Sequence, residues 1–162
     1  MMMKTCFVAC FILSTCLANT AWAVGLSELT PTGSFTAASH EKGPRVKIRI
    51  TIGTKTMTAE LDNNPTARDF LSLLPLTVTL RDFSRAEKVS DALPRRLSEA
   101  DAPASAAGEQ DDIAYYAPWG NIAFYRGEGP DAQGVIKIGK IVSGSEALHQ
   151  PGQISTTLSR AE

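Results

Sequence analysis

The chain has 162 residues, 43% of them hydrophobic, with 16 lysines and arginines against 17 aspartates and glutamates. Its length and composition predict one ordinary globular domain. The near-neutral balance argues against a nucleic-acid partner, because binding phosphates requires a basic surface.

Residues 1–23 have the pattern of a secretory signal peptide. A positive charge at Lys4 precedes the apolar run Cys6–Ala18, and Ala21-Trp22-Ala23 is a small-x-small cleavage site. The apolar run is shorter than the roughly 20 residues that span a bilayer, so we expect no stable membrane insertion of the mature chain. We predict cleavage near Ala23 and a periplasmic or secreted protein.

The alternative is a lipoprotein signal that anchors the chain at Cys16, for which Leu13-Ser14-Thr15 is a poor match. Cleavage after Ala23 removes one positive charge and leaves 139 residues with a net charge of −2. It also removes every cysteine, since the three are Cys6, Cys10 and Cys16. The mature chain is therefore predicted to have no disulfide, thiol nucleophile or cysteine-bound metal.

Residues 24–44 have no hydrophobic period and are rich in Ser, Thr, Gly and Pro, which predicts a flexible lead-in to a domain at 45–160. In residues 46–52, apolar and polar side chains alternate, as is typical of a half-buried strand. Gly53-Thr54 is a two-residue hairpin link, and residues 56–61 alternate again.

A helix is predicted next. Asn64 suits the N-cap, Pro65 suits the first helical position, and Thr66 with Asp69 makes a capping-box-like pair. Pro75 stops the helix. Its apolar stripe consists of Ala67, Phe70, Leu71 and Leu74.

The second half of the chain is predicted to be mainly β. A type I turn with Pro118 and Gly120 joins strands at 113–116 and 122–125. The other predicted strands are 76–83, 93–97 (a short edge strand, because it contains Pro94), 135–141 and 154–158. The other segments are loops at 98–111 and 127–134 and a short helix at 143–149, capped by Ser143 or Ser145.

The count is eight strands and two short helices, and hairpin-length links favour an antiparallel barrel or sandwich. At Asn64–Leu76 and at Asp112–Asn121 the sequence resembles the small bacterial cyclophilin-like domains, a family named for its fold. The resemblance extends over roughly Arg45 to Leu158. It implies a mainly β fold, a closed eight-stranded antiparallel cyclophilin-like barrel with two short capping helices.

The resemblance does not imply an activity. True cyclophilins isomerise X-Pro bonds with Phe-His-Arg and Gln-Gly-Gly-Asp strings, and neither string occurs here. We therefore carry over no catalytic residue. The leading hypothesis is a non-catalytic ligand- or peptide-binding module, and the alternative is a divergent peptidyl-prolyl cis-trans isomerase.

Five aromatic residues within residues 115–125 mark the candidate ligand site. The interior of an eight-stranded barrel is just wide enough for its own side chains, so a ligand would bind on the outer wall or at a rim. Tyr115 and Tyr116 face opposite sides of their strand, and one of them with Trp119 and Asn121 is predicted to form the platform. Alternatively, these aromatics cover the barrel end under a helix or the 98–111 loop, or pack against another subunit.

Arg95 completes the predicted ligand-binding set, because a guanidinium can hold a carboxylate through two hydrogen bonds. The alternative is that Arg95 and Arg96 are solvated charges matched by acidic residues of the neighbouring loop. His40 and His149 do not form a pair at metal-ligand spacing, and neither a nucleophile elbow nor a phosphate-binding loop occurs. We predict no metal and no cofactor, and the expected partner is a small molecule or an extended peptide.

Overall fold

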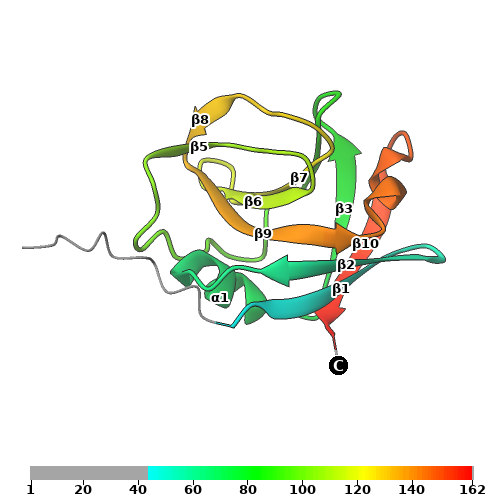
Figure 1. Ribbon diagram of the computed structural model, residues 1–162, viewed down its shortest axis with the longest axis horizontal. Helices are drawn as coiled ribbons and strands as arrows, with labels where there is room; N and C mark the ends of the chain where they lie inside the picture. Colours follow the sequence, from blue (N-terminus) through cyan, green and yellow to red (C-terminus); the bar gives the residue numbers. More distant parts are fainter. Residues whose placement is uncertain (1–43, 162) are drawn as a thin grey trace, which may run out of the picture. The chain divides into compact units, whose positions relative to one another are not determined.

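Eight strands close into an antiparallel barrel in the computed structural model, which describes residues 44–161 (Figure 1). The order around the barrel is β1-β10-β3-β4-β7-β6-β9-β2. This confirms the predicted closed eight-stranded architecture. The barrel strands are β1 (Val46–Ile52), β2 (Lys55–Leu61), β3 (Leu76–Asp82), β4 (Glu87–Ser90), β6 (Asp112–Tyr116), β7 (Asn121–Tyr125), β9 (Val135–Ser143) and β10 (Ile154–Arg160).

Two short strands form a separate sheet beside the barrel. They are β5 (Ser105–Ala107) and β8 (Asp131–Gln133), which pair antiparallel at the upper left of Figure 1, close to β9. Both lie in segments that were predicted to be loops. Neither strand has the alternation of apolar side chains that marks a strand in sequence, because both are only partly buried.

Alternation along the hairpin of β1 and β2 builds one side of the core. Ile50 pairs with Met57 in register, and Ile48 pairs with Ala59. These inward side chains are fully buried, so the barrel interior is filled by the protein itself. The polar residues between them face outward, as the period-2 pattern predicts.

The predicted edge strand at 93–97 is wrong: these residues are irregular, and β4 takes the fourth position in the barrel. The sequence pattern did not indicate β4, because the side chains at its inward positions are polar. Lys88 and Ser90 point into the barrel and are fully buried, whereas Val89 faces the outer wall. The segment at 93–97 instead uses its backbone locally, and the Leu93 amide donates to the Gly120 carbonyl at 2.8 Å.

Helix α1 (Pro65–Leu71) begins where the capping residue predicts. The Asn64 side chain accepts a hydrogen bond from the Ala67 amide at 2.8 Å. The predicted capping-box pair of Thr66 with Asp69 is wrong, because the Thr66 hydroxyl donates to the Ser98 carbonyl at 2.7 Å. The helix ends at Leu71, before the Leu74-Pro75 peptide bond that is cis.

The second predicted helix is a 3₁₀ helix, η1 (Ser145–His149). Its N-cap is Gly144 at a φ of 80°, not a serine, and its backbone passes so close to Thr56 and Met57 that a Cβ would clash. Residues 44–161 therefore contain one α-helix and one 3₁₀ turn in the places of the two predicted capping helices. No helix within residues 44–161 is long and apolar enough to cross a membrane.

The predicted signal peptide at 1–23, the alternative lipid anchor at Cys16 and most of the predicted lead-in at 24–44 lie outside the described residues. They stay predictions from sequence.

Candidate functional site

A cavity of about 230 Å³ lies on the outer wall of the barrel. Its floor is formed by the outward faces of β4, β6 and β7, and it extends to β8. An apolar cluster built around Val89, Ala114, Ala123, Tyr125 and Val135 lies on this side of the wall, separate from the barrel core. The lining residues are Phe83, Glu87, Val89, Ala114, Tyr116, Trp119, Asn121, Ala123, Tyr125, Pro130, Ala132 and Val135.

The register of the strands explains why the floor is recessed. Ala123 of β7 pairs with Val89 on one side and with Ala114 on the other. Small side chains thus meet in the middle of the wall, whereas the larger Tyr116 and Tyr125 stand at its two ends. Because outward positions recur every second residue, Asn121, Ala123 and Tyr125 all face the cavity.

Three aromatic rings stand at one wall of the cavity. The Trp119 ring is edge-on to Phe83 at a centroid distance of 5.4 Å and to Tyr116 at 5.2 Å. Trp119 and Phe83 are 50% and 56% exposed, although each is large and apolar. Their contact brings the turn between β6 and β7 beside the end of β3, and it gives the cavity an aromatic rim open to solvent.

Asn121 places an unsatisfied hydrogen-bond acceptor in this wall. Its amide nitrogen donates to the Ser90 carbonyl at 3.0 Å, which fixes the orientation of the side chain. The residue is 2% exposed, and its Oδ1 has no hydrogen-bond partner within residues 44–161. A buried acceptor without a donor costs about 1–3 kcal/mol, so a ligand that supplies a donor there recovers that cost.

Glu87 and Tyr125 form the other end of the cavity, where they are paired in register between β4 and β7. Burial raises the pKa of the Glu87 carboxyl. Burial, with the nearby carboxylates of Glu87 and Asp112, also raises the pKa of Tyr125 to about 12. Glu87 makes no ion pair with any other residue in the range 44–161.

Two glycines hold the Tyr125 ring in place. A Cβ at Gly108 would overlap the ring, and a Cβ at Gly129 would lie 2.6 Å from its Cε1. The Gly129 amide also donates to the Gly108 carbonyl at 2.9 Å. The loops on either side of the small sheet thus pack backbone against the ring, which leaves it 3% exposed.

Three of the five predicted site residues line this cavity: Tyr116, Trp119 and Asn121. Tyr115 does not, because it is the inward member of its pair and lies fully buried in the barrel. Its hydroxyl accepts a hydrogen bond from the Leu97 amide at 3.3 Å. Of the two arrangements left open by alternation, the structure has Tyr116 outside and Tyr115 inside.

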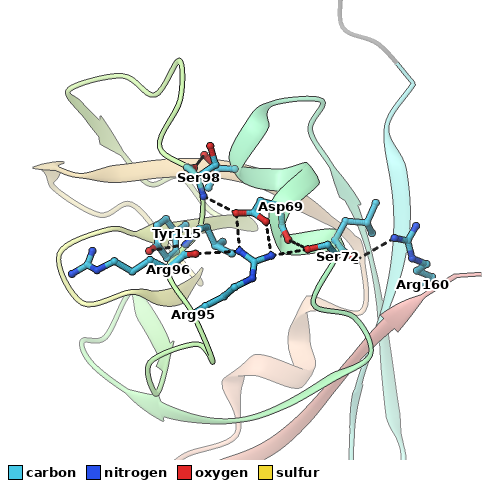
Figure 2. A network of polar contacts seen from close by, with 10 residues as sticks. Asp69, Ser72, Arg95, Arg96, Ser98, Tyr115 and Arg160 are labelled. Atoms are coloured by element: carbon cyan, nitrogen blue, oxygen red, sulfur yellow. Dashed lines mark hydrogen bonds and ion pairs between the residues drawn. The ribbon is translucent and has the colours of Figure 1, made fainter.

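Arg95 lies away from the cavity, in a polar network with α1 (Figure 2). Its two terminal nitrogens donate to the two carboxylate oxygens of Asp69 at 2.9 and 2.5 Å, and Nη2 also donates to the Ser72 hydroxyl. Asp69 accepts a further bond from the Ser98 amide at 2.8 Å. The two-pronged contact predicted for a ligand carboxylate is thus made to a carboxylate of the chain itself.

The same segment supports the turn that carries Trp119. Arg96 donates to the Ala117 carbonyl at 2.6 Å, and the Leu93 amide donates to Gly120. Residues 93–98 therefore connect α1 on one side to the turn between β6 and β7 on the other. The arginines act as structural links here, and Arg96 also approaches Glu99 at 4.0 Å.

Replacing Asp69 with asparagine is expected to lower the free energy of unfolding at neutral pH by about 1 kcal/mol. The hydrogen bonds from Arg95 are the main reason that the pKa of Asp69 is lowered, with the Ser98 amide contributing. The folded state therefore favours the charged carboxylate. The difference in free energy of unfolding between wild type and Asp69→Asn should reach its full size above the ordinary pKa of an aspartate. It should disappear as the pH falls from about 4 through the lowered pKa of Asp69.

Urea titrations of both chains between pH 7 and pH 2 would measure this effect. Asp91→Asn is a suitable control, because Asp91 pairs with Arg81 at an exposed position. A pH-independent difference for Asp69→Asn would contradict the electrostatic explanation.

The sequence did not indicate Phe83, Glu87 or Val89 as site residues. Phe83 ended a predicted strand, and Glu87 and Val89 lay in a stretch with no predicted element. The one available signal was Phe83 itself, a large aromatic residue at the end of an alternating run. Within the described part of the chain, no cluster of three or more His, Cys, Asp or Glu side chains could hold a metal ion.

Fold and cavity together define a small closed antiparallel β-barrel with an aromatic-rimmed recess on its outer wall. The sequence profile of the cyclophilin-like family matches residues 50–159. The chain therefore belongs to the cyclophilin-like family, as the resemblance at the two sequence blocks indicates.

One solved structure with the same fold is the solution structure of the hypothetical protein AF2241 from Archaeoglobus fulgidus. The two chains share 22% sequence identity at a TM-score of 0.53, over 75% of this chain and 99% of the archaeal one. This similarity shows the fold alone. No curated protein matches the chain significantly.

Proposed function

We propose that this chain is an exported, non-catalytic binding domain that takes a small, mostly apolar ligand into the cavity on its outer wall. The observation that carries the proposal is Asn121 Oδ1, a buried acceptor that has no partner within residues 44–161 and lies in the wall of a mostly apolar recess. Such recesses with a few placed polar groups are the usual form of small-molecule sites.

The size of the cavity limits the ligand. Its 230 Å³ exceeds the roughly 150 Å³ of an engineered apolar cavity that takes up benzene, but it is below the usual range for drug-sized ligands. A single ring with a short substituent fits this space. A small molecule is therefore favoured over a long extended peptide.

Titrating a panel of single-ring compounds into the chain while following Trp119 fluorescence tests this proposal. Trp22→Phe leaves Trp119 as the only tryptophan. We expect part of the panel to bind with a saturable change in emission, because the exposed Trp119 ring stands at the cavity rim.

Ala123→Phe fills the floor of the cavity and should reduce the affinity of every compound that binds at least tenfold. Ala92→Leu adds apolar bulk at an exposed position that does not line the cavity and should leave affinity unchanged. Compounds that bind equally to wild type and Ala123→Phe, or a panel without a binder, would refute the proposal.

The isomerase alternative has less support. Its candidate guanidinium, Arg95, is held by Asp69 and does not line the cavity. X-Pro isomerisation by the wild type that is lost in Arg95→Ala would reverse this order of preference.

A further inference from the structure

Two polar side chains at the ends of the outer-wall cavity, Glu87 and Asn121, present hydrogen-bond acceptors. The Asn121 Oδ1 has no hydrogen-bond partner in the described part of the chain, and the amide nitrogen of the same side chain donates to the Ser90 carbonyl. Among the described residues that line the cavity, Glu87 alone carries a charge. A ligand that complements these groups must bring donors, and at the Glu87 end it must bring positive charge.

The aromatic rings of the cavity strengthen the preference for a positively charged ligand. Tyr125 is opposite Glu87 in register, and the Phe83 amide donates to the Glu87 carbonyl at 3.1 Å, while the Phe83 ring packs edge-on against Trp119. The face of an aromatic ring attracts a cation, and the attraction grows when the cation is desolvated. A partly buried carboxylate next to the Tyr125 ring is a site for an ammonium group.

The two acceptors lie at opposite ends of the recess. Asn121 and Tyr125 are four residues apart on β7, which is about 13 Å along the strand, and Glu87 is level with Tyr125. The floor between them is apolar, with Ala123 and Val89 at its centre. One ligand would therefore span from the carboxylate to the amide with an apolar body between its polar ends.

We propose that the cavity binds a primary aromatic amine of the arylethylamine type, with its ammonium group at Glu87 and a neutral hydrogen-bond donor at Asn121. This inference rests on the proposed function, because it assigns the ligand class of the same site. The ring lies on the floor of small side chains, and Trp119 with Tyr116 closes the Asn121 end. Burial raises the pKa of Glu87, and a bound cation opposes that rise by stabilising the charged carboxylate.

Calorimetric titration with matched ligands tests the assignment. Tyramine carries both donors, tyrosol replaces the ammonium with a hydroxyl, and 2-phenylethylamine lacks the phenol. We expect tyramine to bind at least tenfold more tightly than tyrosol and several-fold more tightly than 2-phenylethylamine. The anionic 3-(4-hydroxyphenyl)propionate should bind most weakly, because it faces Glu87 with like charge.

Two variants test whether the ammonium group of the ligand binds at Glu87. Glu87→Gln should remove most of the preference for tyramine over tyrosol while the affinity for tyrosol stays within about twofold. Glu128→Gln is the matched control: Glu128 is an exposed carboxylate that does not line the cavity, and its loss should leave the preference intact.

The results separate this inference from the proposed function. Equal affinities of tyramine and tyrosol for the wild type, with binding blocked by Ala123→Phe, would overturn the amine assignment and keep the binding site. A preference that is lost equally in Glu128→Gln would overturn the role of Glu87. If none of the four compounds binds and the single-ring panel also has no binder, both proposals fail.

Discussion

Replacing Lys88 with alanine is expected to lower the free energy of unfolding by about 2–5 kcal/mol, the range for truncating a long buried side chain. Lys88 is fully buried, pointing into the barrel from β4. Its ammonium pairs with Asp82 at 2.9 Å and donates to the Gly152 carbonyl at 2.8 Å. Truncation removes these contacts and leaves a cavity where the aliphatic stem was packed. Both effects lower the free energy of unfolding.

Lys88→Met separates the two contributions. Methionine keeps most of the volume of the stem and removes the charge, so it should recover the packing part of the loss. Asp82 still has the Gly152 amide and Arg126 as partners, at 2.8 and 3.0 Å. Chemical denaturation monitored by circular dichroism measures all three chains. A Lys88→Ala variant within about 1 kcal/mol of wild type would show that this ion pair is not a structural element of the barrel.

Replacing Gly139 with alanine is expected to cost about 3 kcal/mol or more, at or beyond the upper end for overpacked cores. Gly139 of β9 pairs with Leu61 on one side and with Ile113 on the other. An added Cβ would overlap the Glu60 carbonyl oxygen and lie 2.9 Å from the Leu61 Cα. Because these are backbone atoms, relief requires β2 and β9 to separate, and the barrel closes through that pairing.

Gly127→Ala is the matched control for this substitution. A Cβ there would meet only the Ala86 side chain, at an ordinary 3.8 Å. Alanine also lowers the conformational entropy of the unfolded chain, so this variant should be neutral or more stable by up to about 1 kcal/mol. Thermal and urea unfolding of both variants check the pair. Equal stabilities for Gly139→Ala and Gly127→Ala would contradict the close approach of the two strands.

Much of the barrel follows from local pattern. The hairpin at 46–61 was predictable because apolar side chains alternate in both strands and Gly53-Thr54 permits a two-residue link, where Gly53 has a φ of 57°. The start of α1 was predictable because Asn64 and Pro65 satisfy the needs of a helix N-terminus. β4 was not, because its buried Lys88 is stable only when Asp82 and Gly152 are beside it.

The residues of the candidate site likewise include some that the sequence indicated and others that only the structure revealed. Trp119 and Asn121 were named from sequence because aromatic residues gather around a single turn. Phe83 and Glu87 come from the other side of the wall, and only the pairing of β4 with β7 brings them to the recess. Arg95 was placed in the predicted ligand site because its partner, Asp69, is 26 residues away in the chain.

By itself, the sequence determined the first hairpin, the helix start and the aromatic turn, because each depends on residues that are neighbours along the chain. The strand pattern left a barrel or a sandwich open, and the resemblance at two sequence blocks implied the closed barrel. Only the tertiary structure decided which face Tyr115 and Tyr116 occupy, which carboxylate Arg95 meets, and where Glu87 stands relative to Asn121. Those arrangements depend on strand register across the closed barrel, since the hydrogen-bonding pattern between distant strands sets which side chains share a wall.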